Sequence, residues 1–328
     1  MTRITIAAVP VARRPGPPLR SQRQPRPRLS ADVIAALAGR ATPRDRWLLK
    51  MLAEHRVLTS IQIAQLAYGA PATARHRLLT LWRLRAIDRA QPFTATGSAP
   101  MHYVLGDAGA ALLAAEQGLT AAEAGYRRDL ALAVFASPQL AHTVGTNGVM
   151  TALVAAARTR PGAALATWWP ERRCAQQWGD RARPDAYGRW HEDGRDTDFF
   201  LEYDTGTEPV SKVAAKLSGY AALAEATGIS TPVLFWFPSP ARENSIRPAL
   251  ASGTVPAATA SPAAGRGPGS QVWLPAGRDE TRLRLPGLAL PPPVQISAPA
   301  ARPAACTPAQ AARPGLPGTP VPPMPPAE

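Results

Sequence analysis

The sequence predicts a mixed α+β protein whose two patterned regions lie between low-complexity ends. Apolar residues recur at helical spacing through the first region, and helical and strand-like runs alternate through the second. The 37 prolines of the 328-residue chain are unevenly spread and crowd toward the two ends. Because proline-rich segments bury little apolar surface, less of the chain is expected to fold than its length suggests.

The two ends of the chain are expected to be disordered. Residues 1–40 form a basic arm in this interpretation, since a run such as Arg-Gln-Pro-Arg-Pro-Arg at 23–28 cannot build a core but can hold phosphate. Residues 241–328 are expected to form a largely disordered, Pro/Ala-rich tail. The exception is a short apolar run at 271–274, which could return to the second region as a strand.

Charge composition indicates a polyanionic partner. The chain has a formal net charge of +14, and 34 of its 37 basic residues are arginine. GC-rich coding explains arginine in place of lysine, but it does not explain the surplus of positive over negative charge. The surplus favours binding to nucleic acid, with an anionic membrane surface as a weaker alternative.

Other composition features exclude several classes. The two cysteines, Cys174 and Cys306, are too far apart in sequence to suggest a zinc site or a disulfide framework. No apolar run approaches the length of a membrane span, and the amino terminus lacks the apolar stretch of a signal peptide. A cytoplasmic protein without a membrane partner is therefore expected.

The first patterned region, residues 41–120, begins with three helices. Apolar residues at helical spacing indicate a helix over 44–55, and Thr59 suits the N-cap of a second helix over 60–68. The third helix, over 71–85, begins with a proline, which fits a first helical turn. It is amphipathic, with leucines and a tryptophan on one side and arginines largely on the other.

A predicted β-hairpin follows the third helix. Strand patterns over 87–93 and 101–105 flank a turn-forming stretch, and a further helix follows over 108–117. Three helices and a hairpin in this order make a winged helix-turn-helix, in which the third helix enters the DNA major groove. Such domains also serve as protein–protein modules, but the basic helix and arm favour double-stranded DNA. The candidate contact residues are Arg75, Arg77, Arg83 and Arg85.

The second patterned region, residues 127–240, reads as α/β. A helix over 127–158 is expected to break near Ser137-Pro138, and a helix over 210–226 precedes a buried strand over 233–237. Three strand-like runs lie between the helices, over 165–174, 183–190 and 198–204.

Acidic residues in two of these runs suggest a metal site. Glu202 and Asp204 are two apart, so they project from the same face of a strand. Antiparallel pairing with the preceding run would bring Asp185 beside them. Three convergent carboxylates repel one another unless a cation binds, and their oxygens suit Mg²⁺ or Mn²⁺, which could activate water near a phosphate.

Pro184-Asp185, followed by Glu202-Tyr203-Asp204 and a helix, resembles the PD-(D/E)xK nuclease superfamily. The resemblance implies a restriction-endonuclease-like α/β domain. The superfamily pattern has lysine where this chain has Asp204, but some members carry the lysine on the following helix. Lys212 and Lys216 lie on that predicted helix and are two of the three lysines in the chain; solvation of the helix would explain them equally well.

A wider set of tracts is similar to the replication-relaxation family of plasmids and integrative elements. These tracts are the winged-helix region, Arg183-Pro184-Asp185-Ala186, the run from Phe200 to Glu208, and Lys216 to Tyr220. The resemblance covers about residues 44–238. It implies a role in plasmid replication and DNA relaxation, with plasmid replication or transfer proteins as candidate partners, and it implies no defined chemistry.

Some further residues are candidates with ordinary structural explanations. His142 and Glu171 could complete the carboxylate site, although a lone helical histidine is more often structural. Trp168 and Trp169 could stack on an unpaired base, although aromatic residues in strands usually lie in the core.

Three functions are consistent with these patterns. The favoured one is a DNA-binding accessory protein whose second domain keeps a nuclease-like fold without catalysis. The second is a metal-dependent endonuclease or nickase, with Asp185, Glu202 and Asp204 as metal ligands and Lys216 or Lys212 orienting water. The third is a winged-helix transcriptional regulator.

Overall fold

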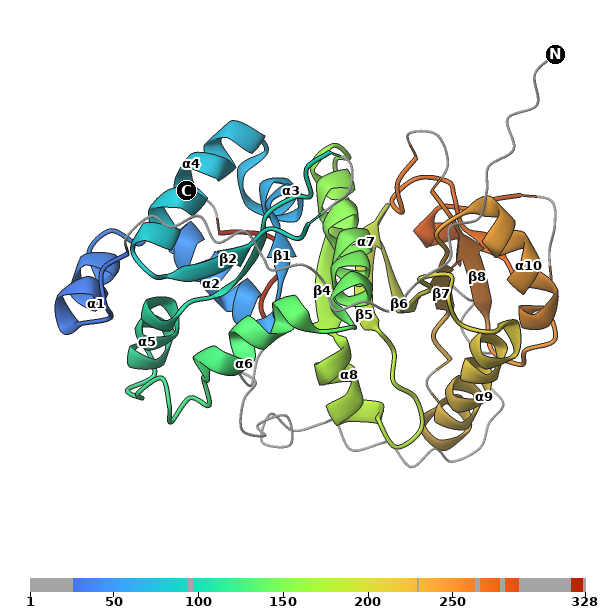
Figure 1. Ribbon diagram of the computed structural model, residues 1–328. Helices are drawn as coiled ribbons and strands as arrows, with labels where there is room; N and C mark the ends of the chain where they lie inside the picture. Colours follow the sequence, from blue (N-terminus) through green and yellow to red (C-terminus); the bar gives the residue numbers. More distant parts are fainter. Residues whose placement is uncertain are drawn as a thin grey trace, which may run out of the picture.

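The computed structural model describes residues 26–93, 97–228, 230–262, 266–277, 281–288 and 320–326. Figure 1 shows an amino-terminal unit of helices with a small sheet beside a larger unit built on a six-stranded sheet. The mixed α+β class predicted from the sequence is confirmed. Most of the predicted basic arm, residues 1–25, lies outside the described residues.

The helices of the amino-terminal unit follow the predicted order. They are α1 (Ala31–Ala38), α2 (Pro43–His55), α3 (Ser60–Ile63) continuing into η1 (Ala64–Tyr68), and α4 (Pro71–Arg83). Thr59 caps α3 as its sequence position suggested, accepting a hydrogen bond from the Gln62 backbone N–H at 3.2 Å. Helix α1 corrects the expectation of disorder through residue 40, because Leu37 is fully buried in the core of the unit.

A three-stranded sheet completes this unit. Strands β2 (Ile87–Ala90) and β3 (His102–Leu105) form the predicted antiparallel hairpin, and β1 (Leu58–Thr59) pairs with the other edge of β3. Part of the hairpin turn, residues 94–96, lies outside the described residues. Helix α5 (Asp107–Ala115) then packs against α1 and α2.

The larger unit begins with helices. These are α6 (Arg128–Ala133), the short η2 (Val134–Ala136) and α7 (Leu140–Arg158), so the long predicted helix breaks at Ser137-Pro138 as expected.

The six strands of the large sheet have the spatial order β4-β5-β6-β7-β8-β9. Strands β6, β7 and β8 run parallel, and the other neighbours pair antiparallel. Their bounds are β4 (Ala164–Pro170), β5 (Ala186–Glu192), β6 (Arg195–Tyr203), β7 (Val233–Trp236), β8 (Ala257–Ala260) and β9 (Leu274–Pro275). The parallel connections are made by α9 (Val210–Thr227) and α10 (Pro240–Leu250).

The two faces of the sheet belong to different cores. Along β6, Phe199 and Leu201 join the core that α7 covers, whereas Phe200 joins the core under α9 and α10. This alternation follows from the two-residue period of a strand. Glu202 therefore lies on the same face as Phe200, under α9.

Two segments correct the sequence-based boundaries. The expected strand over 165–174 ends at Pro170, where α8 (Glu171–Trp178) begins. The first part of the tail predicted over 241–328 folds instead: α10, β8, β9 and the short helix η3 (Leu285–Leu288) extend the larger unit, while residues 289–319 lie outside the described residues. The predicted short strand at 271–274 overlaps β9 at Leu274. Strand β8 reads Ala-Ala-Thr-Ala, and small side chains buried between neighbouring strands carry little apolar signal in the sequence.

The two units share one continuous apolar core, although the sequence suggested separate domains over 41–120 and 127–240. Helix α7 contributes Met150 and Leu153 to the core that contains α2 and α4 residues. Polar contacts reinforce this packing. The Asn147 side-chain amide donates to the Val57 carbonyl at 2.8 Å, and the buried Arg173 guanidinium pairs with Glu54 at 2.7 Å. The amino-terminal unit is therefore held in a fixed orientation on the sheet.

Within the described ranges, no helix combines the length and the hydropathy that a membrane crossing requires.

Candidate functional site

Glu202 is the centre of the most unusual cluster of charge. It is 3 % exposed near the end of β6, and two side chains of α9 meet its carboxylate. The Lys216 ammonium donates to Oε2 at 2.7 Å, and the Tyr220 hydroxyl donates to Oε1. Lys216 and Tyr220 are four residues apart, so they share one face of the helix. Both oxygens of Glu202 are thus satisfied from a single helix.

Asp185 lies beside this cluster, just before β5. Ala186 pairs with Leu201, so the antiparallel register places Asp185 opposite Glu202, as the sequence predicted. One oxygen of Asp185 accepts the Tyr203 backbone N–H at 2.7 Å, and the other lies 3.0 Å from His142 Nε2.

Helix α7 supplies this histidine because it runs very close to β6. A Cβ atom at Gly145 would lie 2.2 Å from the Tyr203 ring, so a larger residue at that position would require the ring or the helix to shift. Close approach of α7 is what brings His142 into the cluster.

The cluster shifts the proton affinities of its members. Burial, and then the neighbouring Asp185 carboxylate, raise the pKa of Glu202 to about 8 against the opposing effect of Lys216. Burial lowers the pKa of Lys216, but the Glu202 and Asp185 carboxylates outweigh burial and raise it above its ordinary value. The hydrogen bond to Asp185 raises the pKa of His142. Glu202 can therefore carry a proton near neutral pH, which an exposed glutamate does not do.

Asp204 does not join Asp185 and Glu202. Its carboxylate pairs with Arg242 of α10 at 2.7 Å and accepts the Gly206 backbone N–H at 2.6 Å. Arg242 also donates to the Glu208 carbonyl. Asp204 thereby fixes the turn after β6 against the start of α10.

The predicted three-carboxylate site for Mg²⁺ or Mn²⁺ is thus not assembled in this arrangement. Among the described residues, no group of three or more His, Cys, Asp or Glu side chains is placed to hold a metal ion. Asp185 and Glu202 remain adjacent, but each of their four oxygens already has a hydrogen-bond or ion-pair partner. A divalent cation would have to displace Lys216 or His142, so the donor set does not fit the metal as it stands.

The two candidate lysines of α9 differ in position. Lys216 contacts Glu202 and is 30 % exposed in its side chain. Lys212 is 67 % exposed and pairs with Glu208 at 2.7 Å, one helical turn away from the cluster. Lys216 is therefore the lysine that occupies the carboxylate site.

Other residues complete the surroundings of the cluster. Tyr220 was not singled out from the sequence, although its four-residue spacing from Lys216 placed both on one helix face. Glu171, at the start of α8, contributes to raising the pKa of His142 and is itself exposed. Cys174 is fully buried, and burial raises the pKa of its thiol, so it behaves as a core residue.

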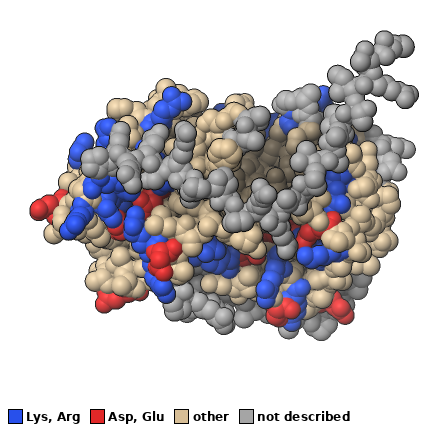
Figure 2. All heavy atoms as spheres, viewed as in Figure 1, with Lys and Arg blue, Asp and Glu red and all other residues tan. Residues whose placement is uncertain are grey.

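The four arginines predicted to contact DNA divide into two pairs. Arg77 donates from Nε to the Asp45 carboxylate at 2.9 Å, and Arg85 donates to Asp107 at the same distance. Arg75 and Arg83 are exposed on α4, and among the described residues they make no ion pair. Figure 2 shows basic side chains over α4 and around the α1 end of the molecule.

Two arginines, Arg26 of the predicted arm and Arg89 of β2, pack on Trp82 of this unit. Arg26 forms an ion pair with buried Asp88, and its guanidinium lies 4.9 Å from the centre of the Trp82 ring. Arg89 lies over the same ring at 4.1 Å.

Trp168 is fully buried and stacks on His55 at 3.7 Å between ring centres, so it is not accessible for stacking on a base.

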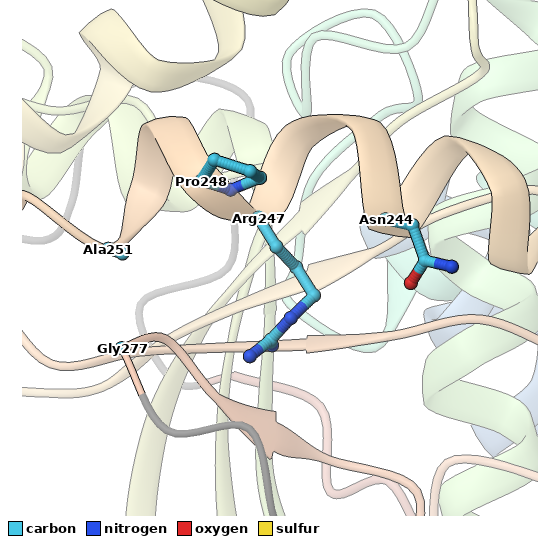
Figure 3. A pocket seen from close by; sticks show the side chains of 5 residues that line it. All are labelled: Asn244, Arg247, Pro248, Ala251 and Gly277. Carbon is cyan, nitrogen blue, oxygen red and sulfur yellow. The ribbon is translucent and has the colours of Figure 1, made fainter.

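A hollow beside α10 does not coincide with either charged region. Figure 3 shows it between α10 and the turn at Gly277, with Arg247 reaching across. The Arg247 guanidinium is fixed there by Thr259 Oγ1 at 2.8 Å and the Leu274 carbonyl at 3.1 Å. These bonds join α10 to β8 and to the edge strand β9.

Comparison with protein families gives a match. The family described as replication-relaxation matches residues 49–238. The matched segment begins within α2 and ends after β7, so it contains α4, the β2–β3 hairpin and the Glu202 cluster. No curated protein and no solved structure matches the chain.

Proposed function

The chain belongs to the replication-relaxation family, and we propose that it is a DNA-binding accessory protein of a plasmid or integrative element. Its role in this proposal is in plasmid replication and DNA relaxation. The amino-terminal unit acts as a winged helix-turn-helix, with α4 in the major groove and the β2–β3 hairpin as the wing. Double-stranded DNA is the partner, together with replication or transfer proteins of the element.

The observation that carries this proposal is the exposed side of α4. Arg75 and Arg83 extend from it into solvent, while Leu78, Leu81 and Trp82 anchor its other side in the core. A helix so anchored can enter a groove as a rigid element, and arginines can contact phosphates or guanine edges. The net charge of +14 adds long-range attraction to the same partner.

The larger unit serves as a nuclease-like scaffold without catalysis in this proposal. The absence of catalysis is supported by the contacts of Glu202 and Asp185. Lys216, Tyr220 and His142 occupy the carboxylate oxygens that a metal ion would need. The shared core fixes this scaffold relative to α4, so DNA bound by the helix is held in a defined orientation to the larger unit.

A second function, metal-dependent cleavage or nicking of DNA, has one observation in its favour. Lys216 lies 2.7 Å from Glu202, with Asp185 adjacent, as a nuclease-like site with its lysine on the following helix would require. The existing partners of all four carboxylate oxygens of Asp185 and Glu202 weigh against cleavage.

DNA binding is tested by fluorescence anisotropy with a labelled duplex and an Arg75→Ala/Arg83→Ala variant. The double variant is expected to bind at least tenfold more weakly than the unchanged protein. Arg195→Ala is the matched control, because Arg195 is exposed at the start of β6 in the other unit. Equal affinities of the double variant and the unchanged protein would contradict the assignment of α4. A footprint confined to the protein's own promoter would favour a transcriptional regulator.

Cleavage is tested separately with supercoiled and linear plasmid in Mg²⁺ or Mn²⁺. The proposal expects binding without nicking. Metal-dependent nicking that disappears in both Asp185→Ala and Glu202→Ala would replace the accessory role with an enzymatic one. Lys216→Ala and Lys212→Ala then identify which lysine the reaction uses.

A further inference from the structure

Residues 320–326, late in the sequence, pack against the amino-terminal unit. There the Trp47 indole N–H donates to the Pro322 carbonyl at 2.7 Å. Val321 is 6 % exposed and Met324 packs beside it, and both contact the core that contains Trp47. Figure 1 shows this red segment among the elements of the amino-terminal unit.

The chemistry of this contact is that of peptide recognition. The segment reads Pro-Val-Pro-Pro-Met-Pro-Pro, so five of its seven residues offer a carbonyl oxygen but no backbone N–H. A partner for such a segment must supply donors and apolar surface, as aromatic-lined grooves do for extended proline-rich peptides. Trp47 supplies both: its ring joins the core and its indole N–H bonds a carbonyl.

Burial gives the contact a definite register. Val321 is the only non-proline residue of the segment besides Met324, and it is the more deeply buried of the two. The prolines on either side are restricted in φ, so little conformational entropy is lost when the segment docks. The buried side chains of Val321 and Pro323, with the hydrogen bond to the Pro322 carbonyl between them, specify where the segment sits.

We propose that the surface of α2 around Trp47 is a binding site for a proline-rich segment, and that residues 320–326 of the same chain occupy it. The tether of residues 289–319 makes this binding intramolecular. A tethered segment competes at a high effective concentration, so the free segment cannot displace it at ordinary concentrations. The site opens only when the chain's own segment leaves.

The test uses the full chain and a labelled, end-capped peptide of residues 320–326. Val321→Asp in the full chain places a charge that cannot enter the core, so the tethered segment is released and the site opens. The peptide is expected to bind this variant at least tenfold more tightly than it binds the unchanged chain, measured by fluorescence anisotropy. A peptide that itself carries Val321→Asp is the matched control and is expected not to bind.

A second substitution tests the indole. Trp47→Phe in the Val321→Asp chain keeps an aromatic ring but removes the donor, and peptide affinity is expected to fall about fivefold, the effect of one hydrogen bond. If circular dichroism shows that Val321→Asp does not fold, Met324→Glu takes its place, because Met324 is only half-buried. Peptide binding that is no tighter to the released chain than to the unchanged chain would overturn the proposal.

Discussion

The face of α4 and the cluster around Glu202 are both sets of like charges in the sequence, but the structure treats them differently. On α4, Arg75 and Arg83 stay in solvent while Arg77 neutralises a buried aspartate. Around Glu202, the three carboxylates Asp185, Glu202 and Asp204 are each paired, and their partners come from other elements of the larger unit. Charge that stays exposed is available to a partner, whereas buried charge is compensated within the fold.

The difference has a physical origin in desolvation. A carboxylate at the end of a buried strand loses its hydration, so only those arrangements are stable in which donors replace the water. An arginine on the outer side of a helix keeps its hydration and needs no partner. A run of like charges in sequence therefore indicates a binding surface only where the fold leaves it in water.

The largest expected effect separates the arginines of α4 by their role in folding. Arg77→Ala leaves the Asp45 carboxylate, which is 1 % exposed, without its cation and should lower the free energy of unfolding by about 3 kcal/mol. Arg75→Ala should change it by less than about 0.5 kcal/mol, since Arg75 is exposed. Urea unfolding of both variants measures the difference. Equal losses would show that the two arginines are not divided as the contacts indicate.

A second comparison concerns the lysines of α9. Lys216→Met removes a donor from buried Glu202 and should cost about 2 kcal/mol of stability. Lys212→Met removes an exposed pair and should cost about 0.5 kcal/mol or less. Thermal and urea unfolding check this order. A larger loss of stability in Lys212→Met than in Lys216→Met would contradict the assignment of Lys216 as the main partner of Glu202.

The pH dependence of stability tests the cluster directly. Because the pKa of Glu202 is raised from 4.5 to about 8 on folding, the folded protein holds an extra proton between these values. The stabilisation from this proton on Glu202 is present at low pH. The free energy of unfolding falls as pH rises through that range, by at most about 1.4 kcal/mol per pH unit. The raised pKa of His142 acts in the same direction. Urea unfolding across this range should show a shallower slope for Glu202→Gln, and an unchanged slope would assign the effect elsewhere.

The smallest effect is on the salt dependence of DNA binding. If Arg75 and Arg83 each contact one phosphate, removing both should reduce the slope of log affinity against log salt by about 2. Anisotropy titrations over a range of salt concentrations measure the slope. If the slope of log affinity against log salt falls equally in the Arg195→Ala control, the overall positive charge of the protein, and not a contact surface on α4, would account for the salt dependence.

Local patterns predicted most of the elements but not their ends. The three helices and hairpin of the first unit appear where the spacing placed them, because each buries one side against the same core. The pattern failed at α8, a short helix that begins directly after Pro170 at the end of β4, and beyond residue 240, where small residues form the buried strand β8. Hydrophobic periodicity has little contrast in β8, whereas α8 is only 8 residues long and offers too few turns for a helical period to stand out from the strand before it.

The candidate site was predictable in part. Asp185 and Glu202 lie together as the strand register implied, since a two-residue period and an antiparallel turn fix neighbours locally. His142 and Lys216 were candidates from the sequence, but which carboxylate oxygen each one contacts was not predictable, because the helices that carry them are placed by packing. The same holds for Arg242, which takes Asp204 away from the expected site.

The sequence by itself determined the mixed class, the order of helices and strands in the first unit, the excess of positive charge and the adjacency of two acidic residues. These follow from local spacing and composition, which need no distant contact. Only the tertiary structure decided which charges remain in water, that the two units share a core, and that residues 320–326 bind Trp47. Such outcomes depend on burial and on contacts between segments far apart in the chain, and no local pattern encodes them.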